Sequence, residues 1–257
     1  MPHGIDPISD RAAYRQIADR LRGAVLRGDL ESGAQLPSER TLMEEYKAAR
    51  GTVRQAISLL RSEGLVTVEH GRGVFVRQQP PIRRLAHDRF ARRHRKAGKA
   101  AFLAEAEAEG RRPEVEVLHV GAEKATAEVV DRLRLSAGES VLVRSRRYLS
   151  DGEPVELATS YLPFDLVDGT PICDPNPGPG GIYARLEELG HQLAHFTEEV
   201  TARMPLPDEV RALRLNPGVP VFRLARTAYD TDGRPVEICD TVMAADRYIL
   251  SYDLPAR

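Results

Sequence analysis

Hydrophobic positions in the first part of the chain recur at steps of three and four residues, as they do along one face of a helix. In the first such segment they are Tyr14, Ile17, Leu21 and Val25. This pattern predicts a helix from Arg11 to Arg27, which Gly28 can end in a left-handed conformation. Pro37 and Ser38 open a second helical segment, and the Ser38 hydroxyl is the expected N-cap.

A third helical segment, from Arg50 to about Glu63, separates its apolar residues from its basic ones. The apolar stripe consists of Val53, Ala56, Ile57 and Leu60. Arg50, Arg54 and Arg61 lie within about 40° of one another on a different side of the helix. Such a helix fits the major groove, where arginine reads guanine and also contacts phosphate. The pattern therefore predicts sequence-specific DNA binding.

A short hairpin is expected directly after this helix. Residues 65–69 and 74–76 are rich in valine, and they flank the turn sequence His-Gly-Arg-Gly. Arg72 lies between Gly71 and Gly73, so the backbone there can approach DNA closely. Three helices followed by a hairpin predict a winged helix-turn-helix.

Charge divides the chain into two parts, although the 257 residues together have a net charge of only −1. Residues 1–99 contain 20 basic and 11 acidic residues, and residues 100–257 contain 17 and 27. The basic half is expected to face nucleic acid. Neither a signal peptide nor a membrane-spanning run is visible, and Cys173 and Cys239 are expected to be buried free thiols. We therefore expect a cytoplasmic protein with no membrane partner.

Residues 82–99 carry eight basic residues and one acidic residue. They could add phosphate contacts, or they could form a solvated connector that neutralises acidic residues of a second domain. Both interpretations stay open at this point. A short helix ended by Gly110 is expected to follow.

The second half contains an internal repeat. Residues 128–156 resemble residues 209–237, so that Glu156 corresponds to Glu237. Each segment indicates a helix, a strand, an Asp-Gly turn and another strand. We expect an α+β domain with one antiparallel sheet, helices on one face, and a ligand crevice where the halves meet.

The N-terminal segments YRQIADRLRGAVLRGDLESGAQLPSER, RGTVRQAISLLRSEGLV and GRGVFV resemble the GntR family of bacterial transcription regulators over residues 11–77. The resemblance implies DNA contacts by six residues: Arg40, Arg50, Thr52, Arg54, Gly71 and Arg72. Thr52 could instead serve only to start its helix, and Arg40 could form only a surface ion pair. One departure is Ala49, because the family usually has a capping serine there.

The second half resembles the HutC subfamily and its effector-binding domain, called UTRA, which is similar in fold to chorismate lyase. The motifs are VLVRSRRYLSDGEPVELATSYLP and YDTDGRPVEICDTVMAADRYIL. The resemblance implies a homodimeric regulator, usually a repressor, that a small molecule releases from a palindromic DNA operator. The expected domains are residues 1–78 for DNA binding, 79–96 as a basic linker, and 97–257 for effector binding and dimerisation.

The resemblance also implies an effector pocket containing Arg146, Tyr148, Tyr183 and Glu237. Members that bind sugar phosphates have a second arginine where this chain has Tyr148, and a serine where it has Gly181. These losses remove phosphate donors, so a carboxylate-bearing or less charged effector is favoured. Arg146 could instead form a surface ion pair, and Glu237 a cross-strand pair.

Two further interpretations concern the function of the second domain. It could serve only for dimerisation, which the residues at Tyr148 and Gly181 favour, or it could be a lyase-like enzyme. No catalytic constellation or cofactor fingerprint supports an enzyme.

The loop DPNPGPGG, residues 174–181, could cover the crevice or merely connect two elements. His191 and His195 have the spacing of a metal pair, but Gly190 should end the helix before them, so no metal and no cofactor are expected.

Overall fold

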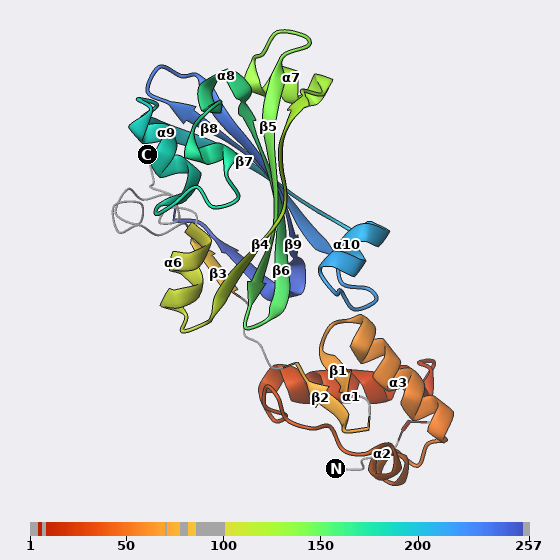
Figure 1. Ribbon diagram of the computed structural model, residues 1–257. Coiled ribbons are helices and arrows are strands. Elements are labelled where there is room, and N and C mark those ends of the chain that lie inside the picture. The colour runs from red at the N-terminus through yellow and green to blue at the C-terminus, as the bar shows by residue number, and fades with distance from the viewer. Residues whose placement is uncertain (1–4, 7–8, 70, 78–81, 86–100, 254–257) are drawn as a thin grey trace. The chain divides into compact units, whose positions relative to one another are not determined.

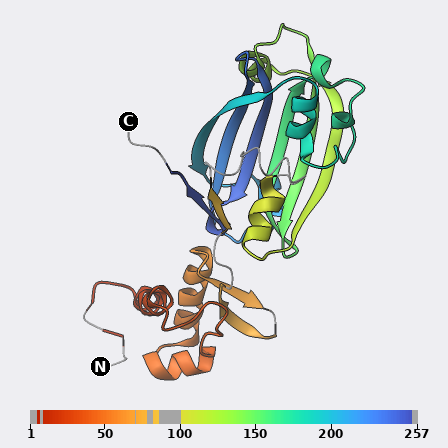
Figure 2. The same ribbon diagram turned by 90° about the vertical axis from the view of Figure 1, so that its left-hand side faces the viewer.

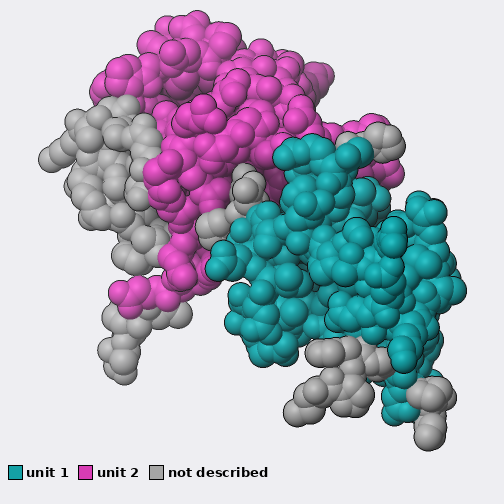
Figure 3. Space-filling view, turned by 90° about the horizontal axis from the view of Figure 1, so that it is seen from below, with its two compact units in different colours: residues 1–80, 215–219 teal, residues 81–214, 220–257 magenta. Residues whose placement is uncertain are grey.

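The computed structural model describes residues 5–6, 9–69, 71–77, 82–85 and 101–253 (Figure 1). The chain divides into two compact units, one of residues 1–80 and 215–219 and the other of residues 81–214 and 220–257 (Figure 3). None of the described helices is both long enough and apolar enough to cross a membrane. Cys173 and Cys239 are both free thiols, as expected, but only Cys239 is buried, whereas Cys173 is half-buried.

The first unit is a winged helix-turn-helix, as predicted. Its elements are α1 (Ala13–Arg27), α2 (Glu39–Tyr46), α3 (Arg50–Ser62), β1 (Val66–Glu69) and β2 (Gly73–Val76). Gly28 ends α1 with φ of 81°, a left-handed conformation. The Ser38 hydroxyl accepts the amide of Thr41 at 3.1 Å, which confirms it as the cap of α2.

A single hydrophobic core holds the three helices and the hairpin of this unit together. Its most deeply buried members are Ile17, Ala18, Leu42, Val53, Ala56, Leu60 and Val66. They come from α1, α2, α3 and β1, and burial of each large apolar side chain contributes about 1.5–3 kcal/mol. The apolar stripe of α3 therefore fixes which side of this helix faces solvent.

The second unit is built from one large sheet and several short helices. Its strands are β3 (Ile82–Leu85), β4 (Pro113–Lys124), β5 (Ser140–Ser150), β6 (Glu153–Pro163), β7 (Leu193–Arg203), β8 (Val221–Asp230), β9 (Pro235–Ala244) and β10 (Tyr248–Ser251). Its α-helices are α6 (Ala101–Ala108), α7 (Ala127–Leu133), α8 (Phe164–Val167), α9 (Gly181–Glu188) and α10 (Pro207–Ala212). Two 3₁₀ turns, η1 (Pro171–Cys173) and η2 (Ala245–Arg247), complete the set.

The large sheet confirms the repeat read from the sequence. Its strand order is β4-β5-β6-β9-β8-β7, with all neighbours antiparallel (Figure 2). The halves join where β6 pairs with β9. Thr159 lies opposite Asp240 in this register, and the offset that relates Glu156 to Glu237 also relates these two residues. A pseudo-twofold axis therefore passes through the centre of the sheet.

The helices cover both faces of the sheet, so the expectation of one covered face is wrong. Phe102 of α6 and Ile182 and Leu186 of α9 pack on one face, toward the viewer in Figure 2. Val129 and Leu133 of α7 pack on the opposite face, against β5 and β9. The apolar side chains of each helix determine the face of the sheet on which it packs. The repeat alone does not predict that face.

Strand β3 pairs in parallel with β10, outside the large sheet. It includes Arg84, which lies in the basic segment whose role the sequence left open. Its side chain is buried and forms an ion pair with Glu198 of β7 at 2.9 Å. Arg84 therefore neutralises an acidic residue of the second unit, as one interpretation expected, but it is buried rather than solvated. Residues 86–99 of that segment lie outside the described residues.

The Asp-Gly hairpin between β8 and β9 depends on a buried carboxylate. Asp230 Oδ1 accepts the amides of Arg234 at 2.9 Å and Asp232 at 3.1 Å, and its Oδ2 lies 2.9 Å from Nδ1 of His191. Burial alone would raise the pKa of this carboxyl, but these hydrogen bonds outweigh burial and lower it.

We expect Asp230→Ala to lower the free energy of unfolding by about 1–3 kcal/mol, because it leaves two amides and an imidazole without their acceptor. Since the folded carboxyl has a lowered pKa, its stabilisation is present above about pH 3.9 and is lost as the pH falls through the folded value. Urea denaturation at neutral and acidic pH measures both effects. Asp232→Ala, at the exposed turn, is the control, and equal stability of both variants would contradict the prediction.

Candidate nucleic-acid interface and effector site

The solvent-facing side of α3 presents two arginines that form ion pairs with the same acidic residue. Arg50 and Arg54 have side chains that are 67% and 64% exposed, and each donates from Nε to Glu39, at 2.8 and 2.9 Å. The hydrogen bonds from Arg50 and then Arg54 lower the pKa of Glu39. Glu39 therefore stays ionised and aligns both guanidinium groups along one side of the helix.

DNA would have to compete with this carboxylate. A phosphate carries the same charge as Glu39, and guanine offers two acceptors in the same fork geometry. Surface ion pairs of this kind contribute about 0–1 kcal/mol, so their exchange for DNA contacts costs little. Ala49 gives α3 no side-chain cap, as its sequence predicted.

The other predicted DNA-contacting residues lie on α2, α3 and the wing. Arg40 is 88% exposed and pairs with Glu44 at 3.0 Å, while Thr52 lies half-buried in the first turn of α3. Arg72 is exposed and pairs with Glu69, and its neighbour Gly71 has φ of 76°. This positive φ requires glycine in practice, so the turn depends on Gly71.

On one face of the second unit, a hydrogen-bonded cluster joins three of the four predicted effector residues. Glu237 is 1% exposed, and its two oxygens accept from the hydroxyls of Tyr183 and Ser160. Arg146 in turn donates from Nη2 to Ser160 Oγ. Arg146 and Ser160 come from the first half of the repeat, and Glu237 and Tyr183 come from the second. The cluster therefore spans the join between β6 and β9.

The charged groups of this cluster are largely buried from solvent. Burial raises the pKa of Tyr183 well above its ordinary value, so the phenol stays neutral and donates to Glu237. Arg226 of β8 lies 3.6 Å from the same carboxylate and 5.8 Å from the Tyr183 ring. Nε of Arg146 is buried and has no hydrogen-bond partner among the described residues. Because this nitrogen is not exposed to solvent, a ligand acceptor can reach it only if neighbouring side chains move.

Tyr148 lies beside the cluster. Its ring is 6.0 Å from the Arg146 guanidinium carbon and 4.7 Å from the ring of Phe102. Arg147 points to the opposite face, where it pairs with Glu116, as strand alternation predicts. Tyr148 therefore gives this side of the cluster an aromatic wall.

Arg144 anchors the segment that leads into α9. Its guanidinium donates to the carbonyl groups of Ile172, Asp174 and Pro175, the last two at 2.6 and 3.0 Å. Burial, together with the nearby charge of Arg146, lowers the pKa of Arg144 to about 10, so it remains protonated near neutrality. The loop from Asp174 is thus fastened to the sheet at its start, and α9 then positions Tyr183.

The sequence reasoning missed Ser160, Arg226 and Arg144 as parts of this site. The repeat contained a signal for Arg226, because the offset that relates Gly138 to Gly218 also relates Arg146 to Arg226. Strand alternation placed Arg144 on the face of Arg146. Ser160 needed the pairing of β6 with both β5 and β9, which no local pattern shows.

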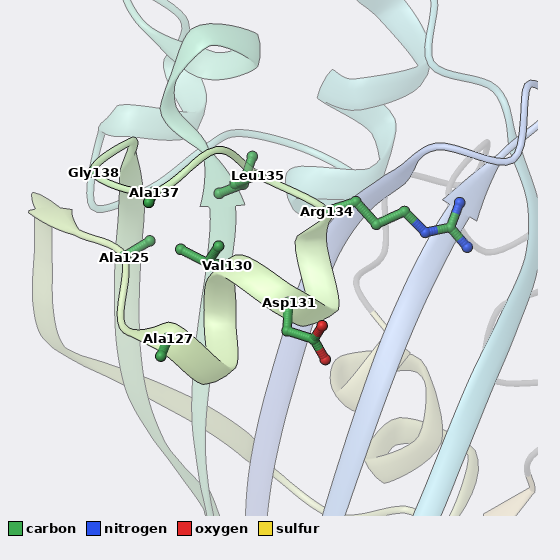
Figure 4. A pocket seen from close by; sticks show the side chains of 8 residues that line it. All are labelled: Ala125, Ala127, Val130, Asp131, Arg134, Leu135, Ala137 and Gly138. Carbon is green, nitrogen blue, oxygen red and sulfur yellow. The ribbon is translucent and has the colours of Figure 1, made fainter.

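A separate hollow of about 620 Å³ lies beside α7 (Figure 4). Its walls are mainly small apolar side chains, and Asp131 and Arg134 point away from the centre. The hollow offers no group of converging polar atoms like that at Glu237. It is therefore a weaker ligand site than the hydrogen-bonded cluster, despite its size.

The two histidines with metal spacing do not act together. His191 follows α9 and bonds to Asp230, whereas the ring of His195, on β7, stacks on Tyr229 at 4.6 Å. Within the described ranges, no group of three or more potential ligands is placed to hold a metal ion.

Comparison with known proteins agrees with both halves of this description. Residues 13–76 match the model for bacterial regulatory proteins of the gntR family, and residues 108–249 match the UTRA domain. An HTH-type transcriptional regulator of Streptomyces coelicolor, SCO4628, is 37% identical over 93% of this chain and 91% of its own length. The chain belongs to the GntR family. Its helix-turn-helix and UTRA domains together are those of the HutC subfamily.

Further GntR-family relatives share the same layout. The HTH-type transcriptional repressor NagR of Bacillus subtilis is 26% identical, with 91% of each chain covered. A crystal structure of a GntR-family transcriptional regulator matches with 32% identity and a TM-score of 0.64, over 96% of this chain and 99% of the other. PhnF of Mycobacterium smegmatis, at 24% identity and a TM-score of 0.61, covers 94% and 100% and shares the fold.

These matches establish the class of function. The chain is a DNA-binding transcription regulator with a small-molecule effector domain, and the lyase-like enzyme interpretation is set aside because the family and these relatives are transcription regulators.

We expect Arg54→Ala to weaken specific DNA binding by about 1–3 kcal/mol and to relax base preference at one position of each half-site. The physical reason is that alanine keeps the helix but removes a forked donor from its exposed side. Fluorescence anisotropy with matched and mismatched duplexes measures both effects. Arg27→Ala removes the same charge at similar exposure, 67%, from α1. If both variants lose affinity alike, with base preference intact, Arg54 does not read a base.

Proposed function

We propose that this GntR-family protein is a homodimeric repressor that binds a short palindromic operator and leaves it when a small effector binds the UTRA domain. Arg40, Arg50, Thr52, Arg54, Gly71 and Arg72 would contact DNA. The predicted effector residues are Arg146, Tyr148, Tyr183 and Glu237, to which the geometry adds Ser160 and Arg226. Two copies would place their recognition helices in successive turns of one face of the duplex, which is why the operator should be palindromic.

The observation that carries this proposal is the separation of the two sides of α3. Val53, Ala56 and Leu60 are fully buried, while Arg50 and Arg54 stand exposed side by side on Glu39. A helix held this firmly on one side can present both guanidinium groups to base edges once they exchange Glu39 for DNA.

For the effector, we propose a small molecule that carries a carboxylate together with a hydroxyl or amino group. The carboxylate would accept from Arg146, whose Nε is free to donate, and the hydroxyl or amino group would donate to Glu237. Tyr148 and Gly181 take the places of a guanidinium and a hydroxyl that sugar-phosphate binding would use. Ser160 supplies one hydroxyl within the cluster, but it cannot replace the missing positive charge.

A second candidate is a regulator whose UTRA domain only dimerises. The burial of Glu237 favours it, since a ligand would have to reach a carboxylate that is 1% exposed and already bonded to Tyr183 and Ser160. A thermal-shift screen with carboxylates, sugars and their phosphates decides between the two. A shift in the native protein that is absent in Arg146→Ala supports the effector site, and no shift with any compound supports dimerisation alone.

The proposed operator binding can be tested with DNA from upstream of the protein's own gene. We expect tight binding that needs both halves of a palindrome and falls steeply with salt, because several arginines replace counterions on phosphate. Anisotropy across a salt series, with scrambled DNA as the control, measures this. A complex containing two chains per duplex supports the homodimer, and one chain per duplex contradicts it.

We expect Arg146→Ala to abolish the effect of the effector on operator affinity while operator affinity without effector stays within about twofold of the native value. The reason is that the substitution removes the anion-binding group from the second unit and leaves α3 unchanged. Arg147→Ala is the matched control, because it removes the same charge from the opposite face of β5. Loss of DNA binding without effector would show instead that Arg146 has a structural role.

A further inference from the structure

Four buried side chains of alternating charge form a row across the second unit, from the proposed effector site to β3. Glu237 lies 3.6 Å from Nη2 of Arg226, and Nη1 of Arg226 lies 3.9 Å from Oε1 of Glu198. The same oxygen of Glu198 accepts from Arg84 at 2.9 Å. The most exposed of the four side chains, Glu198, is only 12% exposed, so solvent screens these charges weakly.

Arg226 lies between two carboxylates, Glu237 at 3.6 Å and Glu198 at 3.9 Å. Burial disfavours its charge, but the neighbouring groups, first Tyr183 and Cys239 and then Glu237 and Glu198, outweigh burial and raise its pKa well above the ordinary value. Arg226 is therefore a permanent charge whose position is set by competition. Whatever draws it toward Glu237 draws it away from Glu198, and the reverse also holds.

At the other end of the row lies β3, which pairs in parallel with β10, from Tyr248 opposite Ile82 to Ser251 opposite Leu85. Ile82 is buried in an apolar cluster with Phe102, and the amide of Arg83 donates to Glu109 at 2.8 Å. Arg84 is 2% exposed and also donates to the sulfur of Met243 at 3.3 Å. The bonds of Arg84 to Glu198 and Met243 add a buried polar anchor to these contacts of β3, which follows the DNA-binding unit along the chain.

We propose that Arg84 is a positioning residue that couples the state of the effector site to the docking of β3. An effector group that engages Glu237 changes the share of the Arg226 charge that reaches Glu198, and thereby changes how firmly Glu198 holds Arg84. The two-state element is β3, anchored or released. This inference rests on the proposed function, since it takes the effector to bind at Glu237.

Hydrogen–deuterium exchange of the amides of residues 82–85 in the full-length protein tests the row, with no effector and no DNA. In Glu237→Gln, Arg226 turns to Glu198 and competes with Arg84, so exchange should become faster by about threefold or more. In Tyr183→Phe, Glu237 loses one hydrogen-bond donor and attracts Arg226 more strongly. Arg226 then competes less for Glu198, the ion pair between Glu198 and Arg84 becomes stronger, and exchange of the β3 amides should become slower. Simple loss of packing would accelerate exchange in both variants.

Glu198→Gln interrupts the row. It should accelerate exchange in β3 by itself, and in that background neither Glu237→Gln nor Tyr183→Phe should change exchange further. Asp240→Asn is the matched control, because Asp240 is also bonded to an arginine, Arg132, at 2.9 Å, but on the other face of the sheet. It should leave exchange in β3 unchanged.

The same sign of change in both far-end variants, or an undiminished effect in the Glu198→Gln background, would overturn the coupling. Because the measurement needs neither operator nor effector, that result would leave the proposed function standing. A failed effector screen, in turn, would not alter the exchange pattern expected of the row.

Discussion

The pairing of β6 with β9 is the constraint on which the second unit depends. Each half of the repeat supplies three strands, and neither half can complete the sheet alone. Because Thr159 faces Asp240 at the pseudo-twofold axis, side chains of the two halves meet along this one seam. Ser160, on the first half, reaches Glu237 on the second, and Arg146 reaches Ser160. A shift of register by one residue would turn these side chains to the opposite face and dissolve the site.

The same symmetry shows why the two halves do not offer equivalent sites. Glu156, the counterpart of Glu237, is also buried and also accepts from a tyrosine, Tyr248, at 3.2 Å. Around Glu156, however, Phe102 and Met243 are buried in an apolar cluster. Around Glu237, the neighbours are Arg226, Arg146 and a serine. The two halves of the repeat therefore surround corresponding carboxylates with different side chains.

The parts of the fold that the sequence predicted are those that local chemistry determines. Helical spacing, the Ser38 cap, the stop at Gly28 and the Asp-Gly hairpins each depend on residues a few positions apart. The contacts of Arg84 and Ser160 join segments far apart in the chain, so no periodic pattern in the sequence predicts them. Arg146, Tyr183 and Glu237 were predicted through resemblance to a family, and the structure brings them together. It does not test their roles, and the expected domain borders also stay predictions.

Buried charges are a costly way to fill a core, since well-packed apolar residues of similar volume are often as stable or more so. The second unit nevertheless buries Arg84, Glu198, Arg226 and Glu237 in one continuous row. None of these side chains has an ideal bidentate partner in the row, and the two contacts of Arg226, at 3.6 and 3.9 Å, are long. Loose contacts of nearly equal length are poor for rigidity but suit competition, because a modest change at one end shifts the balance at the other. In the proposed coupling, this balance carries the state of Glu237 to Glu198 and from there to Arg84.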